Sequence, residues 1–232
     1  MILYVVTDTY ELYKTKPVWF IHRNTLERIA GDACVVLHYT QLDLQTVEQI
    51  NPWAICHSGS TNDVRSMMAY RRVIMETDVA QIGFCGGHQI ITKFYGGELG
   101  SMRKLTPNEP DPNPAYHQGH FKEFGLCSVR IIKVDPLFRG LGRQLHVLEN
   151  HYWEVKRLPP TLVLLASSRV CRVQVFRHRT NPIYGTQFHP EVEGVGRHDG
   201  GAILTNFFRI AKMHHKHLGR QTVQNTPSDR TR

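Results

Sequence analysis

Ile82-Gly83-Phe84-Cys85-Gly86-Gly87-His88-Gln89 joins an apolar run directly to a helix-like segment, with a glycine-flanked cysteine at the junction. Residues 79–84 predict a buried strand, and the residues after the cysteine predict a helix that ends near Tyr95. Glycines permit a sharp strand-to-helix turn that exposes the cysteine, and N–H groups of the first helical turn stabilise a thiolate or an oxyanion. We therefore predict a nucleophile at Cys85 with the Gly86 N–H as an oxyanion donor. The alternative is a buried structural cysteine beside a glycine turn.

The rest of the chain repeats this alternation of apolar runs and helix-like segments, which is typical of an α/β fold with a mainly parallel sheet. Strands are expected at residues 1–6, 33–37, 53–56, 79–84, 127–134, 145–148, 162–167, 171–176 and 183–188, and helices at 17–30, 63–77, 86–95 and 202–214. Residues 101–119 hold four prolines and predict a long loop, a type of segment that often forms a lid or a binding loop. We predict one domain over residues 1–212 and a basic, disordered tail over residues 213–232.

The strand expected at residues 183–188 also ends in ionisable side chains, in the stretch Tyr184-Gly185-Thr186-Gln187-Phe188-His189-Pro190-Glu191. In open parallel sheets, ligands bind at the carboxyl ends of the strands. A histidine base needs an acceptor on its second ring nitrogen, and Glu191 lies two residues beyond His189. Cys85, His189 and Glu191 therefore predict a nucleophile, a base and an orienting carboxylate. The alternative for His-Pro-Glu alone is a surface turn.

The composition of the chain indicates which classes of protein it can belong to. The 232 residues are 41% hydrophobic and 21% charged, which is ordinary for a globular chain with one sizeable core. No apolar window is long enough to span a membrane, and the apolar start meets Asp8 too early for a signal peptide, so we expect a cytoplasmic protein. The five cysteines form no CxxC pair, which argues against a disulfide framework or a cysteine zinc site.

The net charge of +8 comes mostly from the C-terminal end of the chain. Residues 209–232 supply +5 of it, so we assign the basic charge to the tail and the solvated surface rather than to nucleic-acid binding. The histidine clusters at residues 117–120 and 214–217 have no cysteine or carboxylate at ligand spacing. We therefore expect no metal site and no cofactor.

Two motifs, GFCGGHQ at residues 83–89 and YGTQFHPEV at residues 184–192, together resemble the class I glutamine amidotransferases, whose usual forms are GxCxGxQ and GxQFHPE. The resemblance covers residues 1–212. It extends to the turn at residues 55–60, to the segment at residues 150–159, to residues 122–125 and 135–138, and to the closing Gly201, Asn206 and Phe207.

The resemblance implies a flavodoxin-like open sheet with helices on both faces, and hydrolysis of the side-chain amide of glutamine through a γ-glutamyl thioester. It implies that Cys85 is the nucleophile, His189 the general acid/base and Glu191 its orienter. The backbone N–H groups of Gly59 and Gly86 would form the oxyanion hole. The implied substrate contacts are Gln89 and the main chain at Tyr152 and Trp153.

Several alternatives stay open at this point. The ammonia acceptor is expected on another polypeptide, a synthase subunit that would dock over the Cys85 face. The bulky Tyr152 and Trp153 replace smaller and acidic residues of the family, and they favour a stand-alone γ-glutamyl peptide hydrolase as the first alternative. The second alternative is a non-catalytic glutamine-binding regulatory subunit. The loop at residues 101–119 has no counterpart that we can assign in the family.

Overall fold

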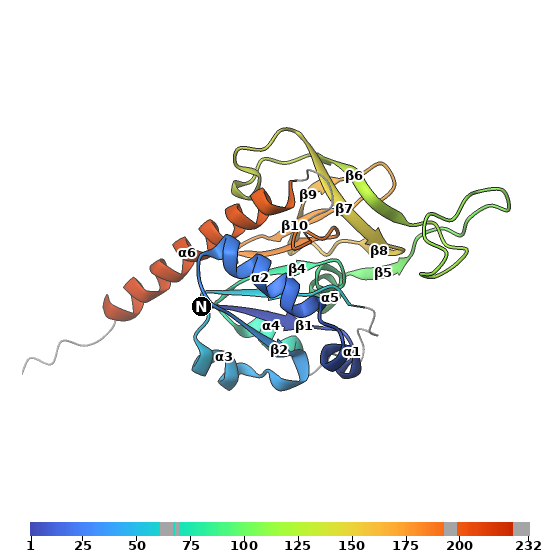
Figure 1. The fold of residues 1–232 in the computed structure, drawn as a ribbon. Coiled ribbons are helices and arrows are strands. Elements are labelled where there is room, and N and C mark those ends of the chain that lie inside the picture. The colour runs from blue at the N-terminus through green and yellow to red at the C-terminus, as the bar shows by residue number, and fades with distance from the viewer. Residues whose placement is uncertain (61–66, 68–69, 193–198, 225–232) are drawn as a thin grey trace, which may run out of the picture.

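The computed structural model describes residues 1–60, 67, 70–192 and 199–224. At its centre is a nine-stranded sheet with helices on both faces, and a two-stranded sheet lies beside it (Figure 1). The strands are β1 (Ile2–Val6), β2 (Cys34–His38), β3 (Ala54–His57), β4 (Ala80–Phe84), β5 (Glu98–Ser101), β6 (Glu123–Ile131), β7 (Gln144–His151), β8 (Trp153–Arg157), β9 (Leu162–Ser167), β10 (Val175–His178) and β11 (Ile183–Thr186). The helices are α1 (Tyr10–Thr15), α2 (Val18–Ala30), α3 (Leu44–Ile50), α4 (Arg71–Glu76), α5 (Gly86–Phe94) and α6 (Gly200–Gln224), with short 3-10 turns at Tyr39–Gln41 and Pro136–Phe138.

The large sheet has the order β2-β1-β3-β4-β11-β10-β9-β6-β7. The five strands from β2 to β11 are parallel to one another, and the strands from β10 to β7 continue the sheet in antiparallel pairs. This confirms the predicted class, an open α/β sheet with helices on both faces in a single domain. The antiparallel continuation accounts for the β-rich second half of the sequence.

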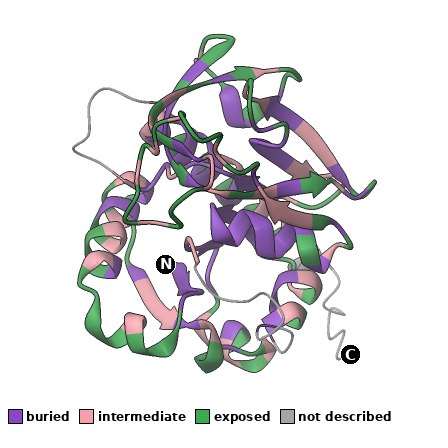
Figure 2. Ribbon diagram, turned by 90° about the vertical axis from the view of Figure 1, so that its right-hand side faces the viewer, coloured by how far each residue is buried: buried purple, intermediate pink, exposed green. Residues whose placement is uncertain are grey.

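The two faces of β1 explain why this strand is apolar at every position. Ile2, Tyr4 and Val6 face a core that includes residues of α2 and α6, whereas Leu3 and Val5 face a second core with residues of α3, α4 and α5. A strand that is covered on both sides must bury successive side chains in opposite directions. Figure 2 shows the result, a buried centre enclosed by largely exposed helices and loops.

The structure adds elements that the sequence pattern did not predict. Strands β5 and β8 pair as a small antiparallel sheet, and α1 and α3 are short helices in the first half. The expected helix at residues 63–77 lies partly outside the described residues, and α4 forms its last part.

The closing helix α6 continues to Gln224, so residues 213–224 of the expected tail are helical. No proline occurs in this stretch before Pro227, and His214 Nε2 donates to the carbonyl of Asp78 at 2.6 Å, which ties this part of the helix to the body. Residues 225–232 lie outside the described residues. Among the helices of the described part of the chain, none is both long and apolar enough to cross a membrane.

The predicted long loop forms a folded flap, which we define as residues 102–122. Its two ends pair through an antiparallel bridge between Lys104 and His120. Inside the flap, Asp111 accepts hydrogen bonds from the backbone of Asn113 and Gly119 and from Lys122 Nζ at 2.7 Å. The side chain of Lys122 is fully buried, so this ion pair is the anchor of the flap.

Candidate active site

Three neighbouring parallel strands, β3, β4 and β11, end together at one edge of the sheet. Phe84 at the end of β4 pairs with Thr186 at the end of β11, and β3 flanks β4 on the other side. The segments that follow these strands, the turn at residues 58–60, Cys85 and residues 187–191, therefore lie side by side. A hydrogen bond of 2.8 Å from the Cys85 N–H to the carbonyl of Thr186, the last residue of β11, joins the second segment to the strand that precedes the third.

Cys85 lies in a strained turn between β4 and α5. Its φ of 45° and ψ of −99° lie in a region that residues with a Cβ rarely adopt. The glycines after it are required for close approach: a Cβ on Gly86 would collide with the backbone N of Ser60, and one on Gly87 would lie 2.6 Å from the carbonyl oxygen of His57. The turn therefore has the geometry of a nucleophile elbow.

His189 follows β11 and lies beside Cys85. Its Nδ1 is 2.9 Å from Glu191 Oε1, and its backbone N–H donates to the carbonyl of Leu148 in β7 at 2.9 Å. Burial disfavours the imidazolium, but the charges of Glu191 and Cys85 and a hydrogen bond with Cys85 outweigh it and hold the pKa of His189 well above its usual range. Because Nδ1 is bound to the carboxylate, Nε2 is the ring nitrogen available to the sulfur.

Gly59 and Gly86 border the same space. A Cβ on Gly59 would lie 3.0 Å from Cε1 of His189, so the backbone of this turn contacts the imidazole closely. Gly86 is the first residue of α5, so its N–H has no acceptor within the helix. The turn is fixed by Thr7, whose N–H donates to Ser58 Oγ at 3.0 Å. Both glycines are therefore placed where a backbone oxyanion hole is predicted.

The predicted substrate contacts also lie near this edge. The Gln89 amide donates to the Trp153 carbonyl at 2.7 Å, and the Tyr152 carbonyl accepts from the Met102 N–H at 2.6 Å. The Tyr152 ring stacks on His117 of the flap, with 3.6 Å between ring centroids, and Trp153 is 38% exposed. The carbonyl groups of residues 152 and 153 thus accept hydrogen bonds from other groups of the protein in this structure.

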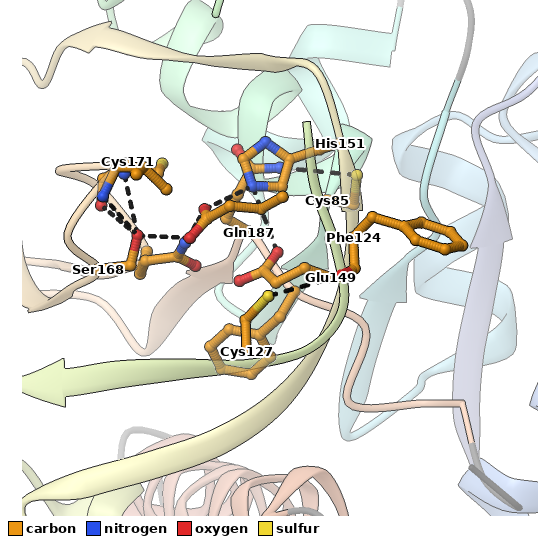
Figure 3. A network of polar contacts seen from close by, with 12 residues as sticks. Cys85, Phe124, Cys127, Glu149, His151, Ser168, Cys171 and Gln187 are labelled. Carbon is orange, nitrogen blue, oxygen red and sulfur yellow. Dashed lines mark hydrogen bonds and ion pairs between the residues drawn. The ribbon is translucent and has the colours of Figure 1, made fainter. Parts of the chain in front are cut away.

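Gln187, within the motif at residues 184–192, has no role predicted from the sequence. Gln187 is fully buried, and its amide donates to Cys85 Sγ at 3.6 Å (Figure 3). Its signal in the sequence was a polar side chain just before the apolar Phe188, two positions before His189.

The family described as Glutamine amidotransferase class-I matches residues 9–211. The chain belongs to the class-I glutamine amidotransferases. A Pyrococcus furiosus protein that is named as a glutamine-hydrolyzing GMP synthase subunit is 34% identical over 198 residues, which cover 82% of this chain and 93% of the relative. The protein of the same name from Pyrococcus abyssi is 33% identical over 195 residues, with the same coverage of each chain.

Solved structures agree with this amidotransferase assignment. A Thermoplasma acidophilum protein described as a GMP synthase subunit superposes with a TM-score of 0.70 at 26% identity, over 94% of this chain and 98% of that chain. A glutamine amidotransferase from Thermotoga maritima shares the fold, with a TM-score of 0.60 at 14% identity, over 96% of this chain and 86% of that chain.

This amidotransferase also contains a second buried group with the same three residue types, Glu123, His151 and Cys171, whose ligand atoms lie within 4.8 Å of one another. His151 Nε2 is 3.0 Å from Glu123 and 3.3 Å from Glu149. Burial opposes protonation, but the two carboxylates raise the pKa of His151 to about 10. Burial and the neighbouring carboxylates raise the pKa of the Cys171 thiol well above its usual range. An imidazolium beside a neutral thiol suits neither nucleophilic attack nor metal binding.

The flap lies against the active-site edge of the amidotransferase. Tyr116 makes an edge contact with Tyr152 at 5.6 Å between centroids, and the stacked pair of His117 and Tyr152 lies next to it. Burial raises the pKa of Tyr116 above its usual range, and the charge of Cys85 adds to this effect. The flap thus packs aromatic side chains against Tyr152, one of the predicted substrate contacts.

Loss of the flap anchor should open the flap without unfolding the domain. In Asp111→Asn, the fully buried Lys122 loses its carboxylate partner. We therefore expect trypsin to cleave within residues 102–122 about tenfold faster, while the melting temperature of the domain changes little. The three trypsin sites of the flap, Arg103, Lys104 and Lys122, and the chain length are unchanged in this variant. Time-resolved mass spectrometry of the digest is the measurement.

Glu109→Gln is the matched control, because its ion-pair partner Arg103 is 54% exposed. Equal cleavage rates for the two variants would contradict the assignment of the Asp111 to Lys122 pair as the anchor.

Proposed function

We propose that this chain is the glutamine-hydrolysing subunit of a synthase whose second subunit consumes the ammonia. The observation that carries the proposal is the placement of Cys85, in a strained elbow, beside an imidazole that is bound to Glu191 at 2.9 Å. The Pyrococcus relatives are named as subunits of GMP synthase, and this supports GMP synthase as the enzyme to which the chain contributes.

In the first half-reaction, the Cys85 thiolate attacks the side-chain carbonyl carbon of glutamine, and a C–S bond forms. The electron pair of the C=O bond moves to oxygen, where the N–H groups of Gly59 and Gly86 stabilise the charge. When the carbonyl reforms, the C–N bond breaks and the His189 imidazolium gives its proton to the departing nitrogen. Ammonia leaves, and a γ-glutamyl thioester remains on the sulfur.

In the second half-reaction, water attacks the thioester while neutral His189 accepts its proton. The C–S bond then breaks, glutamate leaves, and the thiolate and imidazolium are restored. Glu191 keeps its charge throughout and holds the ring by Nδ1, because burial would favour its protonation but the imidazolium holds its pKa below the usual range. Gln89 and the main chain of Tyr152 and Trp153 hold the amino-acid end of the substrate.

The test is glutamate release by the purified full-length chain from L-glutamine and from γ-glutamylglycine, with and without the synthase subunit of the same organism. We expect kcat/KM for glutamine to exceed that for the dipeptide by about a hundredfold, because the aromatic contact of Tyr116 with Tyr152 would hinder a larger leaving group beside the predicted substrate contacts. We also expect the partner to raise kcat, since many catalytic hydrogen bonds tighten only in a complex.

Two results would overturn the proposal. Preference for the dipeptide would establish a stand-alone γ-glutamyl peptide hydrolase, the first alternative in the sequence analysis. Absence of turnover for both substrates, in the presence of the partner and with a correctly folded chain, would establish a non-catalytic glutamine-binding subunit.

A further inference from the structure

The side-chain amide of Gln187 lies between the predicted nucleophile and Gln89. Its Nε2 is 3.6 Å from Cys85 Sγ, and its Oε1 accepts from Gln89 Nε2 at 3.1 Å. The backbone N–H of Gln187 donates to the Gln174 carbonyl at 2.8 Å, and the side chain has no exposure to solvent. Figure 3 shows Gln187 directed from its strand end toward the sulfur.

The hydrogen-bond network fixes which end of the Gln187 amide faces the sulfur. The Trp153 carbonyl can only accept, so the group of Gln89 that lies 2.7 Å from it must be the NH2. The same NH2 contacts Gln187, and it needs an acceptor there, which is the Gln187 oxygen. The Gln187 NH2 therefore has to face Cys85. A flipped amide would place two NH2 groups against each other.

The network ends on a fixed positive charge. His151 Nδ1 lies 3.1 Å from the same Trp153 carbonyl, and its Nε2 is bound to Glu123 and Glu149. An imidazolium in this position donates from both nitrogens, so the carbonyl is held in place and so is the Gln89 amide that it orients. The donor at the sulfur is thus preorganised by a chain of buried contacts.

We propose that Gln187 is a catalytic residue of this glutaminase, in which its side-chain amide donates a hydrogen bond to the Cys85 sulfur and stabilises the thiolate before attack. The role rests on the proposed function. It gives the sulfur two donors: the imidazolium of His189 and a neutral amide that keeps its proton when His189 has transferred one. In the second half-reaction the same amide stabilises the thiolate as it leaves the thioester carbon.

In the described part of the chain, the titratable groups whose pKa responds to the charge of Cys85 come from three elements. His189 follows β11, His151 ends β7, and Tyr116 belongs to the flap; the pKa of each is affected by the charge of the cysteine. All three remain in a Gln187 variant, so a change in the behaviour of the thiol on substitution reports the amide itself.

The experiment measures the alkylation rate of Cys85 by iodoacetamide against pH, with the peptide that contains Cys85 quantified by mass spectrometry. We expect Gln187→Met, which keeps length and volume, to slow alkylation at pH 7 about tenfold and to move the midpoint of the profile upward by about one pH unit. Gln187→Glu, which replaces the donor by a carboxylate, should move it further. In the glutaminase assay, kcat should fall about tenfold, with KM nearly unchanged.

Gln81→Met is the matched control. Gln81 is equally buried in β4, but its amide contacts His57, Ile74 and Thr77 instead of the sulfur. The alkylation profile of Cys85 in Gln81→Met should therefore equal that in the unmodified chain. An unchanged profile in folded Gln187→Met would overturn the proposal. Alkylation needs no glutamine turnover, so this result is distinct from a failure of the proposed function.

Discussion

Replacement of Cys85 by alanine should lower glutamine hydrolysis at least about a thousandfold, while the fold is retained. The reason is that the proposed reaction passes through a covalent bond to this sulfur. Cys56, the thiol within the neighbouring strand β3, is fully buried and cannot take its place. The measurement is the steady-state rate of glutamate release, together with a thermal melt to confirm that the variant is folded.

Cys171→Ala is the informative control, because Cys171 belongs to the second buried group of cysteine, histidine and glutamate. Among the described residues, its thiol hydrogen-bonds only to the Val173 carbonyl, at 3.8 Å. Glutamine turnover should therefore stay close to that of the unmodified chain. If Cys171→Ala lost glutamine turnover and Cys85→Ala kept it, the nucleophile would be Cys171, and the assignment of Cys85 would be refuted.

Replacement of His151 by asparagine should destabilise the domain by about 3–5 kcal/mol, because it leaves Glu123 and Glu149 buried without a cation. His151 itself is 1% exposed, so water cannot replace the lost charge. Chemical denaturation at pH 7 is the measurement. Adding Glu149→Gln to the variant should recover part of the loss, since it removes one of the two unpaired carboxylates.

The contribution of His151 to stability should also depend on pH in a defined direction. Its pKa is raised to about 10 in the folded state, against an ordinary value of about 6.5 in the unfolded chain. The folded state therefore holds a proton that the unfolded state releases, and the stabilisation is complete below about pH 6.5 and is lost as the pH rises through about 10. The difference in unfolding free energy between the chain and His151→Asn should shrink across this window.

His57→Asn is the control with the opposite pH dependence of stability. Burial lowers the pKa of His57 to about 4, so its contribution should fall as the pH drops from about 6.5 toward 4 and should not change between about pH 7 and 10. A difference for His151→Asn that stayed constant over the same alkaline range would refute the charged state assigned to His151.

The elbow and the strand-end histidine could be predicted from sequence because their signals are local. A glycine-flanked cysteine between an apolar run and a helix specifies one turn, and β4 ends at Phe84 as expected. Parallel strands that alternate with helices specify that such ends meet at one edge. The sequence predicts α6 too short, because the mostly polar residues after His214 favour a tail, whereas no proline occurs before Gln224 to end the helix.

The buried charged group could not be predicted, because its members are far apart in sequence and meet only through sheet order. Glu123 begins β6, and Glu149 and His151 end β7, where an alternation of polar and apolar residues predicts a solvent-facing side. The antiparallel register pairs Glu123 with His151 and turns both inward. The contacts of Gln187 and of the flap tip depend in the same way on tertiary neighbours.

The backbone N–H of His189 donates a hydrogen bond to the Leu148 carbonyl in β7, so the two proposed reacting groups are attached to different parts of the sheet. Cys85 is carried by a parallel strand at the centre of the sheet, whereas His189 is tied to an outer antiparallel ribbon. A rigid shift of that ribbon by a fraction of an ångström alters the alignment of imidazole and sulfur and leaves the elbow intact. Strands β6 and β7 therefore bear on the geometry of the reacting pair, although neither strand carries a reacting group.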